Sequence, residues 1–182
     1  MRNALANFVY VDNSNVWIEG MHVSAVRAGM APDLFTAQNA KITDTSWRLD
    51  FGRLYDFAVA ERPPGRAALF GSRPPQNDSL WEVAQRRGFE TIVFDRNVAN
   101  KEKKVDAAIV TEMLTDAFTR MTPGDEITLV AGDKDFVPPV ERIIERGFPV
   151  YVVFWDHAAR ELREACSDFT PLNDHLDFLR SR

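Results

Sequence analysis

The stretch Phe8-Val9-Tyr10-Val11-Asp12 and the later stretch Ile127-Thr128-Leu129-Val130-Ala131-Gly132-Asp133-Lys134-Asp135 decide the fold class of this chain. Short apolar runs rich in β-branched residues are typical of parallel strands buried on both faces. Both runs end in aspartate, and ligands bind at the carboxyl ends of the strands in an open α/β sheet. The two runs therefore predict the type of sheet and the edge at which a site lies.

The rest of the chain alternates between strand-like and helix-like segments, which predicts an α/β fold. Five strands are expected, at residues 7–11, 67–70, 91–94, 127–131 and 150–154. Helices are expected at residues 15–28, 50–61, 79–87, 105–121, 137–146 and 158–166, with a loop or an insertion at 29–45. A strand order of 3-2-1-4-5 makes a three-layer α/β/α sandwich with a mainly parallel five-stranded sheet.

No repeat or linker divides the chain, so we expect residues 1–182 to form one domain with its core at about 7–172. The residues that follow are expected to form a tail that packs on the body through Phe169, Leu172, Leu176, Phe178 and Leu179. The chain has 45% hydrophobic residues and a single cysteine, Cys166. No apolar run approaches the roughly 18 residues of a membrane span, and no signal peptide is evident, so we expect a cytoplasmic protein without a membrane partner.

The net charge of −5 argues at first against a nucleic-acid partner, but the charge is unevenly distributed. Residues 53–104 hold ten Lys or Arg against seven Asp or Glu, whereas residues 105–182 hold eight against fifteen. A bound divalent cation would offset about two of the negative charges. An ordinary solvated surface explains the pattern equally well.

Four aspartates form the candidate site. With the first and fourth strands adjacent, Asp12 lies near Asp133 and Asp135, and Asp106 joins from the start of the long helix. Two carboxylates ~4–5 Å apart repel by roughly 3–4 kcal/mol at an effective dielectric of 20. Either some of the aspartates are protonated or a cation lies among them, and at neutral pH a divalent cation is the simpler explanation. Hard oxygen ligands suit Mg²⁺ or Mn²⁺, and metal-assisted cleavage of a phosphodiester is the leading interpretation.

Each acid also has a simpler structural role. Asp12 could cap the following helix, Asp133 and Asp135 could be turn residues, and Asp106 could complement the helix dipole. Asn15 could orient a water molecule at the site or cap the helix itself.

Basic and aromatic residues could contact a nucleic acid near these acids. Lys103 and Lys104 end the basic segment 96–104, and Arg73 follows the second strand, so their side chains could bind phosphates. Exposure to solvent is the alternative. The four tryptophans, Trp17, Trp47, Trp81 and Trp155, could stack on bases, although packing in the core or at its rim explains them better.

Three motifs together resemble the NYN domain family, most closely its bacterial LabA-like branch within the PIN-like nuclease superfamily. They are Val11-Asp12-Asn13-Ser14-Asn15-Val16, Lys104-Val105-Asp106 and Val130-Ala131-Gly132-Asp133-Lys134-Asp135-Phe136. Trp47-Arg48-Leu49-Asp50 and Arg160-Glu161-Leu162 are also similar to that branch, and the resemblance extends over about residues 7–172.

The resemblance implies a PIN-like parallel sandwich and a Mg²⁺- or Mn²⁺-dependent ribonuclease that acts on RNA. It implies that Asp12, Asp106, Asp133 and Asp135 are the acidic positions of the site and that Asn15 is the asparagine of the first loop. It also makes a homodimer an expectation. The family often has serine or threonine where this chain has Ala131, so a hydroxyl beside the metal is missing.

Two other functions remain open. A phosphatase of the haloacid dehalogenase type also has an aspartate after its first strand, but Ser14 occupies the position of its second aspartate. A non-catalytic module that binds RNA or protein and retains the acidic pocket is favoured by Ala131 and by the net negative charge.

Overall fold

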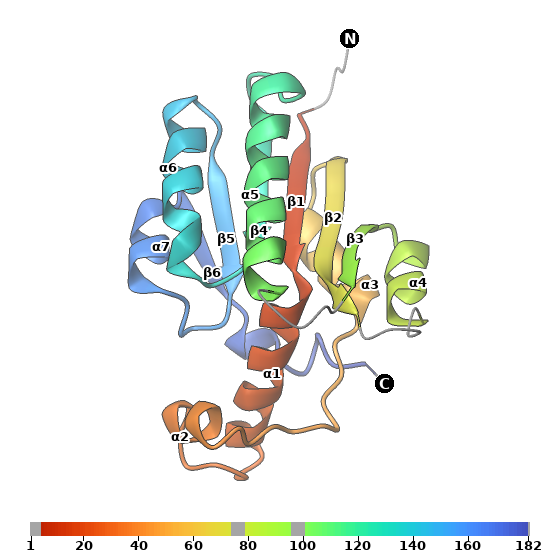
Figure 1. The fold of residues 1–182 in the computed structure, drawn as a ribbon, viewed down its shortest axis with the longest axis vertical. Helices are drawn as coiled ribbons and strands as arrows, with labels where there is room; N and C mark the ends of the chain where they lie inside the picture. Colours follow the sequence, from red (N-terminus) through yellow and green to blue (C-terminus); the bar gives the residue numbers. More distant parts are fainter. Residues whose placement is uncertain (1–4, 74–78, 96–100, 182) are drawn as a thin grey trace.

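The computed structural model describes residues 5–73, 79–95 and 101–181, and it contains a six-stranded sheet with helices on both faces (Figure 1). The strands are β1 Asn7–Asp12, β2 Pro64–Arg73, β3 Glu90–Asp95, β4 Glu126–Val130, β5 Val150–Phe154 and β6 Asp168–Pro171. The helices are α1 Asn13–Arg27, α2 Leu34–Asn39, α3 Phe51–Val59, α4 Ser79–Arg86, α5 Lys101–Thr119, α6 Val137–Glu145 and α7 Arg160–Ala165. Two short 3₁₀ helices are η1 Lys134–Phe136 and η2 Asn173–His175.

The strand order is β3-β2-β1-β4-β5-β6, and each neighbouring pair is parallel. The predicted order 3-2-1-4-5 is therefore confirmed, but the prediction of five strands is wrong because β6 extends the sheet beyond β5. β6 has only four residues, is half-exposed and ends at Pro171, so it lacks the apolar pattern of a central strand. The order reverses between β1 and β4, which places a ligand crevice at their carboxyl ends.

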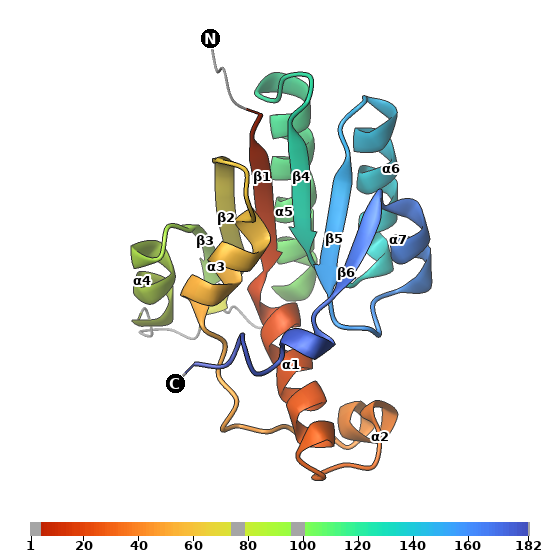
Figure 2. The ribbon, with the colours of Figure 1, turned by 180° about the vertical axis from the view of Figure 1, so that it is seen from behind.

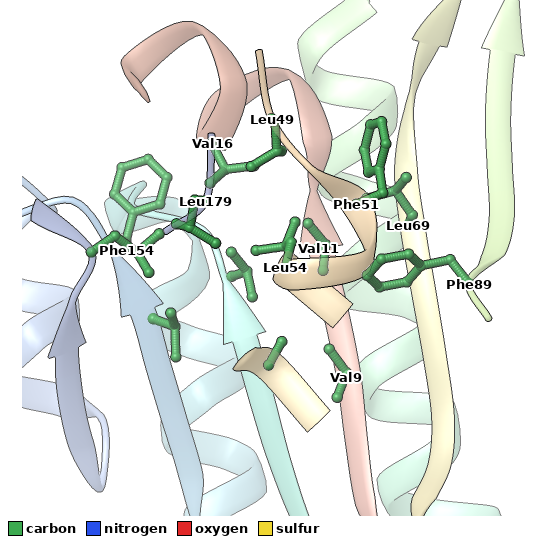
Figure 3. Close-up of a cluster of buried hydrophobic side chains, with 14 of the residues drawn as sticks. Val9, Val11, Val16, Leu49, Phe51, Leu54, Leu69, Phe89, Phe154 and Leu179 are labelled. Carbon is green, nitrogen blue, oxygen red and sulfur yellow. The ribbon is translucent and has the colours of Figure 1, made fainter. Parts of the chain in front are cut away.

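Two faces of β1 supply two separate parts of the core. Val9 and Val11 point into a cluster with helices α1, α3 and α4, part of which is drawn in Figure 3. Phe8 and Tyr10 point into the opposite cluster, which helices α5, α6 and α7 complete. All six residues of β1 are buried, as expected of a central parallel strand covered on both faces.

The segment 29–45 contains a helix, α2, where the sequence predicts a loop or an insertion and no helix. Asp33 caps this helix, and its Oδ1 accepts a hydrogen bond from the backbone N–H of Thr36 at 2.7 Å. Ala37 is its one buried residue, so α2 has no apolar face that a sequence pattern would reveal. The pair α1 and α2 extends beyond the carboxyl end of the sheet (Figures 1 and 2).

Side chains from the tail and three of the tryptophans lie in the core. Leu172, Leu176 and Leu179 are buried, whereas Phe178 is 47% exposed. The tryptophans at positions 47, 81 and 155 are buried, which confirms core packing over base stacking for these three. Within the described ranges, no helix combines the length and the apolar character needed to cross a membrane.

Candidate metal centre

Asp12 ends β1 and also caps α1. It is 4% exposed, and its Oδ1 accepts a hydrogen bond from the backbone N–H of Asn15 at 3.1 Å. Helix α1 therefore begins at Asn13, earlier than predicted, and the capping role belongs to Asp12 and not to Asn15. A carboxylate has about four acceptor sites, so one capping hydrogen bond is compatible with metal binding.

The position of Asp133 depends on Gly132. A Cβ atom at Gly132 would lie 2.2 Å from Cδ1 of the buried Phe154 ring, so only glycine fits against this ring. The carbonyl oxygen of Gly132 accepts a hydrogen bond from the N–H of Ala159 at 2.8 Å. These two contacts fix the backbone immediately before Asp133.

Asp133 and Asp135 are turn residues and members of the cluster at the same time. Oδ1 of Asp133 accepts a hydrogen bond from the backbone N–H of Asp135 at 3.0 Å and starts η1. The turn interpretation is therefore confirmed for this segment. The same turn brings the second carboxylate back beside the first.

Asp106 reaches the cluster from the second turn of α5. The helix begins at Lys101, where the sequence predicted a start at residue 105. The favourable effect of the helix dipole on an acid is greatest in the first turn, so this alternative loses its basis at Asp106. Residues 101–104 of the basic segment are helical, and residues 96–100 lie outside the described part.

Carboxylate oxygens of Asp106, Asp133 and Asp135 all lie within 4.8 Å of one another. We call these three residues the acidic cluster. At this separation two full charges repel by roughly 3 kcal/mol at an effective dielectric of about 20, less where solvent screens the exposed Asp135. Three hard oxygen donors from three positions fit a divalent cation such as Mg²⁺ or Mn²⁺, so the cluster could hold a metal ion. Asp12 lies at the neighbouring strand end but outside this group, and its role as a ligand stays a prediction.

The predicted substrate contacts are only partly described. Lys104 is exposed, two residues before Asp106. Strand β2 carries Arg73 to the carboxyl edge and α5 contains Lys103, but the side chains of both lie outside the described part. Asn15 is half-buried. Its role in orienting a water molecule at the site stays a prediction.

Sequence reasoning missed two features at this edge. Lys134 is exposed between Asp133 and Asp135, and its place inside the motif could have drawn attention to it. Glu19 contacts His157 at 2.7 Å, although 138 residues separate them in the chain. No local spacing could have indicated that contact.

Comparison with known proteins identifies the family. The model of the NYN domain matches residues 33–173, which include all three members of the acidic cluster. The chain therefore belongs to the NYN domain family, a family of PIN-like nucleases. The match begins after Asp12 and Asn15, so it does not bear on those two residues.

A solved structure has the same fold. The crystal structure of VPA0982, a protein of unknown function from Vibrio parahaemolyticus RIMD 2210633, is similar with a TM-score of 0.68. The two proteins are 20% identical, and the similarity covers 96% of each chain. A search of curated proteins finds no match.

Proposed function

We propose that the protein is a metal-dependent ribonuclease that hydrolyses phosphodiester bonds of RNA. The observation that carries the proposal is the acidic cluster: three carboxylates within 4.8 Å of one another in a chain of the NYN family. They lie where the strand order reverses, which is the usual place for a ligand in an open α/β sheet.

Each residue of the site has a proposed task. Asp106, Asp133 and Asp135 hold the cation, and Asp12 joins them from β1. A bound divalent cation stabilises negative charge on a phosphoryl oxygen and acidifies water. Asp135 would complete this set of ligands or orient the attacking water. Lys104 and Lys134 are exposed cations beside the cluster and would bind the phosphates of the RNA backbone.

A cleavage assay tests the proposal. Labelled single-stranded and structured RNAs are incubated with the protein in Mn²⁺, in Mg²⁺ and in EDTA, beside the variants Asp133→Asn and Asp12→Asn. Glu82→Gln is the matched control, because it removes one exposed carboxylate in α4, near the opposite edge of the sheet from β5 and β6. We expect metal-dependent cleavage that both aspartate variants lose and the control retains. Full activity in either aspartate variant would refute the proposed site.

A second candidate function is a non-catalytic module that binds RNA or protein. Ala131 favours it, because this buried residue cannot supply the hydroxyl that many family members have before the Gly-Asp pair. This candidate predicts that RNA binding survives loss of the aspartates and that no RNA is cleaved. The assay above, combined with a binding measurement on Asp133→Asn, separates the two functions.

A further inference from the structure

A single carboxylate connects three segments at the carboxyl end of the sheet. Nε2 of His157, in the loop after β5, lies 2.7 Å from Oε2 of Glu19 in α1. A carboxylate only accepts, so this nitrogen is the donor. The same oxygen accepts a second hydrogen bond from Nε2 of Gln38 in α2, also at 2.7 Å. Glu19 therefore ties both α1 and α2 to the loop that follows β5.

Glu19 is in its charged form at neutral pH. Partial burial acts to raise the pKa of its carboxyl, but the hydrogen bonds from His157 and Gln38 outweigh burial and hold the pKa below its usual range.

The hydrogen bond to Glu19 is the one polar attachment of the His157 ring that the described residues provide. Nδ1 of His157 is buried and has no hydrogen-bond partner within them. An unpaired buried nitrogen is unfavourable, and a phenylalanine ring would avoid it. The histidine is therefore best explained by the bond that its Nε2 makes with Glu19.

Two short paths lead from His157 to the backbone before Asp133. The His157 ring packs edge-on against Phe154, with ring centroids 5.9 Å apart. Phe154 in turn packs directly on Gly132. The second path follows the chain for two residues to Ala159, whose N–H donates to the carbonyl oxygen of Gly132 at 2.8 Å.

We propose that Glu19 and His157 are positioning residues for Asp133. The pair fixes the loop after β5, and that loop holds Gly132, so Asp133 stays where it meets Asp106 and Asp135. The inference deepens the proposed function and rests on it, because it assigns the pair to the geometry of the same acidic cluster.

A double-mutant cycle on Mn²⁺ affinity tests the proposal. Calorimetry compares the native protein with Glu19→Ala, His157→Ala and the double variant. Each single change should weaken Mn²⁺ binding about tenfold, at the low end of what outer-shell partners contribute. The effect of the double variant should fall clearly short of the sum of the two single effects, because both changes break the contact between Glu19 and His157. Glu19→Gln should bind like the native protein, since its amide oxygen still accepts from His157.

A control separates positioning from a general loss of stability. Val59→Ala removes buried volume from α3, which packs on the opposite face of the sheet from α5 and α6. It should lower the melting temperature and leave Mn²⁺ affinity unchanged. The proposal is overturned if both single variants bind Mn²⁺ within about twofold of the native protein, or if their effects simply add.

Amide hydrogen exchange keeps the test independent of metal binding and of RNA cleavage. Glu19→Ala and His157→Ala should accelerate exchange at Asp135 and Ala159, whose N–H groups bond to Asp133 and Gly132, by about tenfold. Val59→Ala should not. A native protein that binds no Mn²⁺ and cleaves no RNA would refute the proposed function, whereas unchanged exchange would refute the positioning role.

Discussion

Helix α5 carries carboxylates in two settings, and the difference shows how one residue type serves two purposes. Towards its C-terminus, Glu112 and Asp116 contact the guanidinium group of Arg66, together with Glu90 at the start of β3. Near its N-terminus, Asp106 lies in the acidic cluster. The first setting contains its own positive charge, whereas the second gathers like charges.

Arg66 and the side chains around it form a network of hydrogen bonds and ion pairs centred on Asp116. The side chain of Arg66 is only 9% exposed, and its Nη1 lies 2.9 Å from Oδ2 of Asp116. The hydroxyl of Tyr10 donates to the same oxygen at 2.6 Å, and Arg120 contacts Oδ1 of Asp116 at 3.0 Å. Burial, followed by this hydrogen bond, raises the pKa of the Tyr10 hydroxyl above its usual value. These contacts join β1, β2 and α5, so this group stabilises the fold.

The acidic cluster instead brings the carboxylate oxygens of Asp106, Asp133 and Asp135 within 4.8 Å of one another. Within the described ranges, neither Asp133 nor Asp135 forms an ion pair. A cation from outside the chain would relieve the repulsion between the three carboxylates. The comparison therefore predicts that changes at Arg66 act on stability and that changes in the cluster act on metal binding and activity.

The largest expected effect follows from Arg66→Met. Asp116 keeps its contact with Arg120 but loses its buried cation, so we expect the free energy of unfolding to fall by about 3 kcal/mol, the low end for a broken buried pair. Urea unfolding at pH 7 measures the change. Mn²⁺ affinity, measured in the folded protein, should stay at the native value. A large loss of affinity would show that the two settings are not independent.

Asp133→Asn is expected to reduce activity without reducing stability, which is the reverse of the effect of Arg66→Met. Loss of a ligand should reduce RNA cleavage by more than the ~10–100-fold that loss of an outer-shell partner causes. The metal-free variant should be at least as stable as the native protein, because one of three like charges is gone and the asparagine oxygen can still accept from Asp135. Cleavage kinetics measure the loss of activity, and urea unfolding measures the stability. A destabilised variant with normal activity would show that Asp133 serves the fold and not the metal site.

Gly132→Ala should affect both properties. The added methyl group would overlap the Phe154 ring, and overpacking of this kind typically destabilises by about 1–3 kcal/mol. Any relief must move the backbone before Asp133, so Mn²⁺ affinity should fall as well. Thermal unfolding and calorimetry measure the two effects. A stable variant with native affinity would mean that the Phe154 contact does not position the cluster.

Glu90→Gln should have the smallest effect, a change in how the stability depends on pH. The hydrogen bonds of Glu90 with Arg66 hold the pKa of its carboxyl below its usual value, although burial opposes them. A depressed folded-state pKa adds stability that is complete above the unfolded-state value and is lost as the pH falls through the folded-state value. Between about pH 5 and pH 3 the native protein should lose stability more steeply than Glu90→Gln. If urea unfolding shows that both proteins lose stability equally over this pH range, the prediction is contradicted.

The sequence predicted the central sheet well and its edges poorly, for a physical reason. β1 and β4 are buried on both faces, so their apolar runs are continuous and their ends can be read from the chain. β6 and α2 are short, and α2 buries one residue and β6 none, so tertiary contacts, not periodicity, determine them. Edge elements of this kind carry little sequence signal.

The candidate site also contains residues that the sequence predicted and residues that it did not. Asp106, Asp133 and Asp135 were predictable because two of them follow a buried strand and the third lies near the start of the helix that leads into it. Glu19 and His157 were not, because their contact spans 138 residues and depends on how α1 packs beside the end of β5.

A titration of the metal-free protein with Mn²⁺ tests the central claim most directly. Calorimetry should show binding by the native protein and by Glu82→Gln, and a large loss of affinity in Asp106→Asn and in Asp133→Asn. That result would establish that the acidic cluster binds a divalent cation. A native protein that binds no Mn²⁺, or aspartate variants that bind it as well as the native protein does, would contradict the account.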